Sequence, residues 1–164
     1  MRASHMIATV GGIGHLRPAS GTWGSLAALP LAWAILTLGG VYLFIALLCV
    51  VFAAGLWATR AETAGKANHD PSEIVVDEVT GQWVALLPVA FGATMMGAAP
   101  ERLWPGWVVA FLMFRLFDIW KPGPVGWADR RDDALGVMLD DVIAGLLAAV
   151  VVVAAAAIAH GLMV

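Results

Sequence analysis

Four carboxylates lie within nine residues between Asp70 and Glu78, in the stretch DPSEIVVDE. If this stretch is helical, Asp70, Glu73 and Asp77 follow one another at spacings of three and four residues and share one face. Like charges held this close repel one another, so they require a cation or strong hydrogen-bond donors. Carboxylate oxygens are the ligands that hard divalent cations prefer. The stretch therefore predicts a metal site that includes Asp77.

The same acids also have a purely structural interpretation. Asp70 is a suitable helix N-cap, Pro71 suits the first helical position, and Glu73 can close a capping box. This interpretation accounts for Asp70 and partly for Glu73. It leaves Asp77 and Glu78 unexplained, because they lie one turn deeper and next to an apolar run, so we favour the metal site.

A second candidate group lies in the segment FRLFDIWKPGP, where Arg115, Asp118 and Lys121 recur every three residues. Interfacial anchoring is the structural alternative, with Asp118 paired to Arg115 and the cations extended towards lipid headgroups. An acid at the end of a membrane span is costly unless it is used, which favours a functional role for Asp118 and Lys121. For Arg115 the two interpretations have equal weight.

A third candidate group is the adjacent pair Asp140 and Asp141, before the apolar run 142–161. Neighbouring helical residues point about 100° apart, so one acid can face the bundle while the other faces water. Favourable interaction with a helix dipole is the structural alternative. The nearby acids are expected to be solvated or to cap helices: Asp129, Asp132 and Asp133.

The Gly-rich segment 7–22 offers a possible anion site. Arg17, Ser20 and Thr22 precede an apolar run that begins at Trp23, and a helix N-terminus preceded by glycine binds anions readily. The isolated histidines are expected to be structural or incidental: His15, His69 and His160.

Composition and charge pattern predict the elements that must position these groups. The chain has 164 residues, of which 61% are hydrophobic and 13% charged, with a mean hydropathy of +0.86, whereas soluble domains carry about 25% charged residues. The apolar residues form charge-free blocks of membrane-span length. We expect an all-α integral membrane helical bundle of about five spanning helices, with short cytoplasmic interfacial helices. The expected spans are 23–40, 41–59, 79–97, 103–120 and 142–161, and Gly39–Gly40 is expected to form a tight turn.

Domain organisation and orientation follow from the same pattern. Residues 1–6, MRASHM, resemble an expression leader, and residues 7–164 form one membrane-embedded domain. The positive-inside rule makes the side that carries nearly all the cations cytoplasmic. The cations of that side are Arg17, Arg60, Lys66, Arg115, Lys121, Arg130 and Arg131, against Arg102 on the other side. Nearly all acids lie on the cytoplasmic side as well, so we expect the chemistry there and no nucleic-acid partner. The single cysteine, Cys49, lies mid-span and excludes both an internal disulfide and a cysteine phosphatase.

Four motifs together resemble the phosphatidylglycerophosphatase A family. They are SGTWGSL at 20–26, DPSEIVVDE at 70–78 with Gly81, FDI at 117–119 with Lys121, Pro122 and Pro124, and Asp140-Asp141 with Ala144-Gly145. The resemblance covers nearly the whole chain after Met6, and DPSEIVVDE is its most specific part. Ser20 and Gly123 depart from the family, which usually has proline at both positions, so loop conformations are expected to differ there.

The resemblance implies a magnesium-dependent lipid phosphatase of the bacterial inner membrane. Its substrate would be phosphatidylglycerophosphate, its products phosphatidylglycerol and phosphate, and its active site would lie on the cytoplasmic side. The expected Mg²⁺ ligands are Glu73, Asp77, Glu78, Asp118, Asp140 and Asp141. The expected catalytic residues are Asp77, Asp118 and Lys121, and the expected phosphate-binding residues are Arg17, Thr22, Arg115 and Lys121. The acids exceed the needs of one Mg²⁺, so either two ions bind or some acids support the ligands.

Two other functions are compatible with a membrane protein rich in acids. A phospholipid headgroup transferase shares the Gly-x-x-x-Asp pattern at 136–140, but the rest of its motif is missing. An ion or proton transporter is the other, because acids in membrane helices often mark ion pathways. Transport requires polar groups near the bilayer midplane, and the middles of the expected spans are apolar.

For the phosphatase, water activated by the metal is the simplest nucleophile, and Asp118 is a less favoured one.

Overall fold

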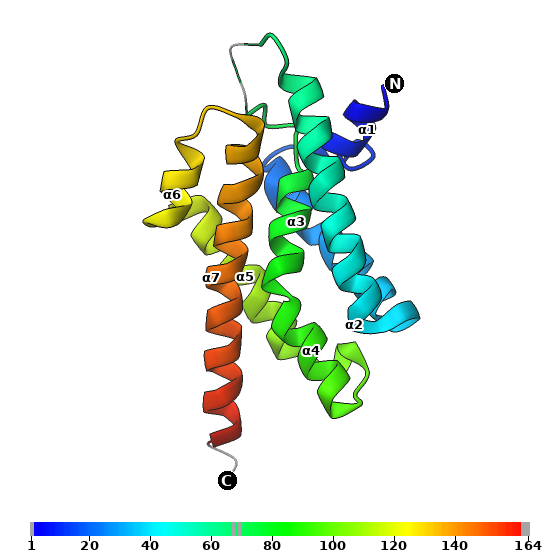
Figure 1. Ribbon diagram of the computed structural model, residues 1–164. Helices are drawn as coiled ribbons and strands as arrows, with labels where there is room; N and C mark the ends of the chain where they lie inside the picture. Colours follow the sequence, from blue (N-terminus) through cyan, green and yellow to red (C-terminus); the bar gives the residue numbers. More distant parts are fainter. Residues whose placement is uncertain (1, 67, 69, 162–164) are drawn as a thin grey trace.

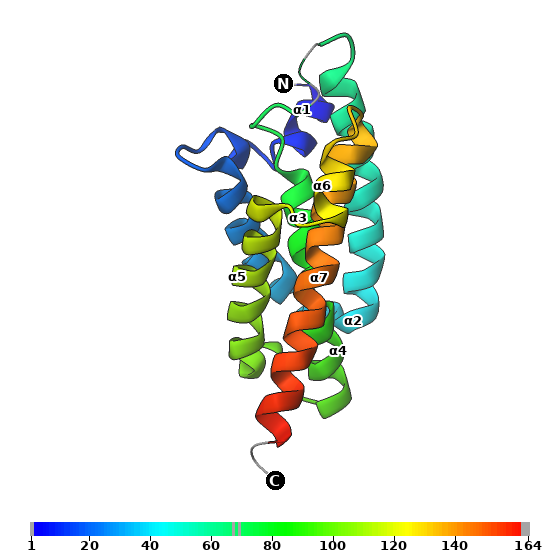
Figure 2. The same ribbon diagram turned by 90° about the vertical axis from the view of Figure 1, so that its left-hand side faces the viewer.

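The computed structural model describes residues 2–66, 68 and 70–161, and these residues form helices and connections without any strand. The elements are α1 (Ala3–Ala8), η1 (Ile13–His15), α2 (Ser20–Thr63), α3 (Val76–Ala85), α4 (Leu87–Met96), η2 (Pro100–Leu103), α5 (Trp104–Trp120), α6 (Pro124–Asp129) and α7 (Ala134–Gly161). The bundle is elongated, with α2, α3–α4, α5 and α7 running along its length (Figure 1, Figure 2). The expected all-α class is confirmed.

The 44-residue α2 is two helices joined at Gly40. Gly40 has φ 66° and ψ −165°, a backbone conformation that residues with a side chain rarely adopt. The chain reverses direction there, so the two arms of α2 run antiparallel in both views (Figure 1, Figure 2). The turn expected at Gly39–Gly40 is therefore confirmed.

The stretch 79–97 is not one uninterrupted helix as expected. It is divided into α3 and α4, which meet at an angle of 42°. Pro88 lies in the first turn of α4, and proline lacks the N–H that would continue the hydrogen-bond ladder of α3. Three described helices are long and apolar enough to cross a membrane, namely α2, Pro100–Trp120 and α7. The bent α3–α4 pair makes a fourth if it is counted as one span.

The start of α3 also differs from the expectation. Residues 70–75 form turns, and the helix begins only at Val76. The N–H of Val75 donates to the carbonyl of Ala8 at 2.9 Å, which ties this segment to α1 and keeps it out of the helix. For this reason Asp70, Glu73 and Asp77 do not share a helical face, and the capping box of the structural alternative does not form at Asp70.

Helix α7 begins eight residues before the expected span. Asp133 caps it, because its Oδ1 accepts a hydrogen bond from the N–H of Gly136 at 2.7 Å. The capping role expected for this acid is confirmed. Asp140 and Asp141 consequently lie two turns inside the helix, and both are buried. The expectations that they open a helix and that one of them faces water are wrong.

Two glycines bring α3 and α7 into close contact. A Cβ atom on Gly81 would lie 2.6 Å from the carbonyl oxygen of Asp141, and one on Gly145 would lie 2.3 Å from the carbonyl oxygen of Gly81. Both distances are shorter than any real Cβ contact, so glycine is required at both positions for this helix spacing. Asp77 and Asp141 each lie four residues before one of these glycines, on the stretch where the two helices are closest.

On its other side α3 packs against α2. The indole of Trp83 donates to the carbonyl of Ala28 at 2.9 Å and lies 5.4 Å, centroid to centroid, from the ring of Phe44. Both aromatic side chains are buried. Helix α3 is thus held between α2 and α7 in the middle of the bundle.

The N-terminal segment is tied to α2. Residues 3–6, which the sequence assigns to a leader, form most of α1, where Ser4 donates to Glu62 at 2.6 Å. Nδ1 of His5 lies 3.3 Å from the same carboxylate, and its Nε2 lies 3.2 Å from Nε2 of His15. His15 is therefore not isolated as expected, and His69 lies outside the described residues.

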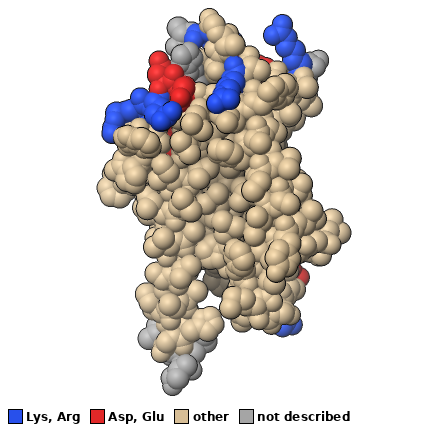
Figure 3. Space-filling model, in the orientation of Figure 1, with Lys and Arg blue, Asp and Glu red and all other residues tan. Residues whose placement is uncertain are grey.

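Charge and apolar surface are separated along the molecule. In Figure 3 nearly all the visible charged side chains gather at the end where α1 and α6 lie, and the long sides seen in this view are uncharged. Large apolar side chains are exposed on those sides, including Val150 at 67% and Ile158 at 63%. A lipid environment is the physical setting in which such a surface is stable.

Candidate active site

Five carboxylates from three helices meet near the charged end of the bundle. This acid cluster comprises Asp77 and Glu78 of α3, Asp118 of α5, and Asp140 and Asp141 of α7. Carboxylate oxygens lie within 4.8 Å of one another in two groups, Asp77–Glu78–Asp141 and Asp118–Asp140–Asp141. Because Asp141 belongs to both groups, the five acids form one cluster, as expected of acids from three separate segments.

The acid cluster is buried. Asp77, Asp118, Asp140 and Asp141 are all less than one-tenth exposed. Removing carboxylates from water is costly unless cations or hydrogen-bond donors replace the lost hydration. Two of them accept a hydrogen bond from the backbone of the next residue, since the N–H of Glu78 donates to Asp77 and that of Asp141 donates to Asp140, both at 3.0 Å.

Two cations partly balance the acid cluster. Nη1 of Arg115 lies 2.7 Å from Oδ2 of Asp118 and 3.5 Å from Oε1 of Glu78. Nζ of Lys121 lies 2.9 Å from Oδ2 of Asp140 and also bonds to Asp129.

Asp77 and Asp141 have no Lys, Arg or His partner among the residues that the structure describes. Five carboxylates against two cations leave a formal excess of three negative charges. In addition, Oε2 of Glu78 is buried without a hydrogen-bond partner in the described part of the chain. A divalent cation fits this donor set, because every donor is a carboxylate oxygen and the cluster lacks positive charge.

The acid cluster lines a cavity of about 210 Å³, called here the acid cavity. Its walls are Ser20, Asp70, Ser72, Ile74, Asp77, Glu78, Asp118, Lys121, Val137, Asp140 and Asp141. Seven charged side chains, from the turn before α3, from α3 and from the ends of α5 and α7, thus surround one space that a small anion with a cation can occupy. The volume suits a phosphate group rather than a whole lipid.

Lys121 supplies the positive charge in the wall of the acid cavity. Burial alone would lower the pKa of Lys121, but hydrogen bonds to Asp129 and Asp140 outweigh it and hold the pKa above its usual value. The side chain is therefore charged throughout the physiological range. Its backbone has φ 50°, in the left-handed region that favours glycine, so a lysine at this helix end carries a conformational cost that its side-chain contacts offset.

Four of the expected site residues do not line the acid cavity. Glu73 is half-buried beside Gly14, and Arg17 donates to the hydroxyl of Ser72, itself a wall residue, at 3.1 Å. Thr22 lies in the first turn of α2, and Arg115 is buried behind the acids that it pairs with. The roles expected for these four residues remain predictions.

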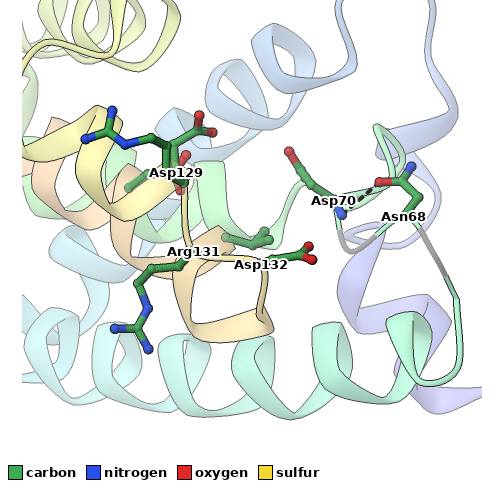
Figure 4. A pocket seen from close by; sticks show the side chains of 8 residues that line it. Asn68, Asp70, Asp129, Arg131 and Asp132 are labelled. Atoms are coloured by element: carbon green, nitrogen blue, oxygen red, sulfur yellow. Dashed lines mark hydrogen bonds between the residues drawn. The ribbon is translucent and has the colours of Figure 1, made fainter.

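Asp70 is a wall residue that the sequence interpretation did not include among the expected ligands or catalytic residues. Asp70 is exposed, but partial desolvation by the surrounding chain raises the pKa of its carboxyl group. It also lines an outer cavity of about 260 Å³, whose other walls are Asn68, Asp129, Arg130, Arg131, Asp132, Val137 and Asp140. In Figure 4 the N–H of Asp70 bonds to Asn68, at 3.0 Å, whereas Arg131 extends away from Asp70. The two cavities share three walls, so the acid cavity continues towards the loop surface. Membership of DPSEIVVDE was the signal that could have identified this acid.

Gln82 is a second residue that the sequence interpretation missed. It lies one turn below Glu78 on α3, is fully buried, and neither atom of its side-chain amide has a partner among the described residues. A buried amide without partners is rare in folded proteins. The polar region of the site therefore extends one turn deeper than the acids.

The arrangement can bind a cation and a phosphate group side by side. Hard oxygen donors face one space, a permanently charged lysine lies beside them, and the surrounding helices exclude bulk water. These are the elements that phosphoryl transfer requires, since it depends on positioning and charge neutralisation more than on covalent chemistry.

Comparison with known proteins agrees with this chemistry. The chain matches the family described as Phosphatidylglycerophosphatase A over residues 6–156. A Haemophilus influenzae protein with that name is 36% identical over 151 residues, which cover 92% of this chain and 86% of the relative. The Escherichia coli protein of the same name is 33% identical over 147 residues, covering 88% of this chain and 78% of the relative.

A third relative carries a different name. A Bacteroides thetaiotaomicron protein named Putative phosphatidylinositol-3-phosphatase is 37% identical over 113 residues, covering 67% of this chain and 64% of the relative. No solved structure matches the chain significantly. The match over residues 6–156 spans all three helices of the acid cluster. From this match and the two long alignments, the chain belongs to the phosphatidylglycerophosphatase A family.

Proposed function

We propose that this chain is a magnesium-dependent phosphatase that hydrolyses the terminal phosphomonoester of phosphatidylglycerophosphate to phosphatidylglycerol and inorganic phosphate. The observation that carries the proposal is the cluster of five carboxylates beside Lys121, four of them buried, in a chain of this family. The names of the two long relatives supply the substrate. The acid cavity supports a small, charged reacting group attached to a larger lipid.

Magnesium is the proposed cation. Asp77, Glu78 and Asp141 would hold it in one group of acids, and Asp118, Asp140 and Asp141 in the other. Octahedral sites built only from oxygen suit Mg²⁺ and its close relatives. When bound, the ion would neutralise phosphoryl oxygens and lower the pKa of water. Glu73 is proposed to support this site from the turn before α3 rather than to bind the ion.

Side chains of the protein bind the phosphate group and orient the attacking water. Lys121 donates to a phosphate oxygen from the wall of the acid cavity, and its charge offsets the charge that develops there. Asp77 and Asp118 accept hydrogen bonds from the attacking water and orient it towards phosphorus. Arg17 contacts the phosphate at the rim, next to Ser72, and Thr22 contacts it from the first turn of α2.

For the membrane topology we propose five crossings. Each arm of α2 on either side of Gly40 has about 20 residues, the length of one span. The bent α3–α4 pair, α5 and α7 supply the other three. Most of the Lys and Arg residues lie at the end that carries the acid cavity, so that end is proposed to face the cytoplasm of the bacterial inner membrane.

Phosphate release from phosphatidylglycerophosphate in mixed micelles tests the proposal. We expect turnover by purified protein with Mg²⁺, loss of turnover in the presence of a chelator, and loss in Asp77→Asn and Asp118→Asn. Phosphatidylinositol 3-phosphate serves as the comparison substrate because of the name of the third relative. Absence of phosphate release from the first lipid by the folded wild-type protein would refute the function.

A flux assay separates the phosphatase from the transporter. The acids lie at one end of the bundle, which favours surface chemistry over passage through the bilayer (Figure 3). We expect protein in sealed liposomes to release phosphate without dissipating a proton or Mg²⁺ gradient. Flux without phosphate release would support the transporter instead.

A further inference from the structure

Arg115 contacts the acid cluster from outside the lining of the acid cavity. Its Nη1 lies 2.7 Å from Asp118, 3.5 Å from Glu78 and 3.4 Å from the hydroxyl of Ser25 on α2. The side chain is only 14% exposed. Arg115 is not among the described residues that line the acid cavity. Its guanidinium is therefore occupied by acids rather than open to the acid cavity.

The backbone of α2 closes this side of the cluster. A Cβ atom on Gly21 would lie 1.8 Å from Oε1 of Glu78 and 3.3 Å from Nη1 of Arg115. The pair of Glu78 and Arg115 therefore lies directly against the glycine backbone, where no side chain fits. A lipid phosphate cannot reach the guanidinium from this direction.

The ion pair between Arg115 and Glu78 is incompletely matched. Nε of Arg115 and Oε2 of Glu78 are both buried, and neither has a hydrogen-bond partner in the described residues. A well-matched buried arginine–carboxylate pair makes two parallel hydrogen bonds, whereas here a single nitrogen serves two carboxylates. Buried polar atoms without partners in a native fold indicate an exchangeable neighbour such as water or an ion.

We propose that Arg115 is an internal counter-ion that competes with the divalent cation for Glu78 and Asp118 and so sets the affinity of the site. This inference rests on the metal site of the proposed function. Each of the two groups of carboxylates contains one of the acids that Arg115 holds. A cation that binds either group therefore shares a carboxylate with Arg115 and competes with Arg115 for the charge of that carboxylate.

The charge of the acid cluster determines whether replacing Arg115 raises or lowers the affinity for the cation. Replacing Arg115 by a neutral residue raises the formal excess of negative charge from three to four. A divalent cation should then bind about tenfold more tightly or better, since one positive charge close to it is removed in a medium of low dielectric constant. A residue that only supports the fold would have the opposite effect, because its loss lets the acids move apart.

Isothermal titration calorimetry with Mg²⁺ alone, without lipid substrate, measures this affinity. We expect Arg115→Gln to bind Mg²⁺ about tenfold more tightly than wild type and Arg115→Lys to stay within about twofold. Arg130→Gln is the matched control, because it removes the same charge at the same end of the molecule from a residue outside the acid cluster. We expect its affinity to match wild type.

Weaker or unchanged Mg²⁺ binding by folded Arg115→Gln would overturn the counter-ion role. If that variant does not fold, ¹⁵N guanidinium NMR of the wild type decides, with Arg115 assigned by its absence in Arg115→Lys. We expect the Arg115 signals to shift on saturation with Mg²⁺, and unchanged signals would overturn the proposal. Binding is measured without turnover, so wild-type protein that binds Mg²⁺ but releases no phosphate refutes the phosphatase alone.

Discussion

Replacing Gly145 by alanine tests whether the spacing of α3 and α7 controls the site. The new Cβ would lie 2.3 Å from the carbonyl oxygen of Gly81 and 3.0 Å from Cβ of Val84. A normal contact requires more than about 3 Å, so the two helices must separate by roughly 1 Å, and overpacking of this kind costs about 1–3 kcal/mol. Asp141 lies one turn before Gly145 and moves with it.

The expected consequence for activity is larger than that for stability. A displacement of about 1 Å at a catalytic constellation lowers the rate by about 100-fold. Phosphate release in mixed micelles measures the rate, and thermal unfolding in detergent measures the stability of the same preparation. We expect kcat to fall by about 100-fold while the protein remains folded, with a modest loss in Tm.

Gly92→Ala is the matched control for this substitution. Gly92 lies in α4, and a Cβ there meets nothing within 4 Å. Alanine in a helix is favoured over glycine by about 1 kcal/mol, so Tm should rise slightly and activity should not change. Wild-type kcat in Gly145→Ala would refute the argument that the close approach of α3 and α7 assembles the site.

Three further predictions concern single side chains. Asp141→Asn removes the carboxylate shared by both groups of acids, so the Mg²⁺ concentration for half-maximal phosphate release should rise by about 10-fold or more; an unchanged value would contradict the shared role. Asp133→Ala removes the cap of α7 and should cost about 1 kcal/mol near neutral pH. Arg131 and the N–H of Gly136 donate hydrogen bonds to Asp133 and lower its pKa from the ordinary value of 3.8. The difference in thermal stability between wild type and Asp133→Ala should therefore be complete above pH 3.8 and vanish as the pH falls through the pKa of Asp133 in the folded protein. Gln82→Leu replaces a buried amide without partners by an apolar side chain of similar size and should raise stability by about 1–2 kcal/mol; a lower Tm would show that the amide is bonded in the folded protein.

The all-helical fold and the position of the charged side chains at one end of the bundle could be predicted, because each follows from the local sequence. Charge-free runs long enough to span a bilayer predict helices without any knowledge of their neighbours. The turn at Gly40 was predictable for the same reason, since a Gly-Gly pair between two apolar runs interrupts a helix locally.

Helix boundaries were not predictable where distant residues determine them. Helix α3 starts at Val76 because the preceding N–H bonds to Ala8, far away in the sequence. Helix α7 starts at Ala134, in a charged stretch that resembles a loop, because its first turns pack against neighbouring helices that bury Met138 and Asp140. In both cases tertiary contacts outweigh the local pattern.

The sequence by itself determined which side chains of this protein can bind a cation, because carboxylate and lysine chemistry belongs to the residue type. It could not determine which acids meet. Glu73 lies four residues from Asp77 yet stays outside the cavity, whereas Asp141, far along the chain, completes both groups of carboxylates. Only the tertiary structure decided this, because glycines let α3 and α7 touch backbone to backbone, which brings Asp77 and Glu78 to Asp141, and α5 adds Asp118 from a third direction.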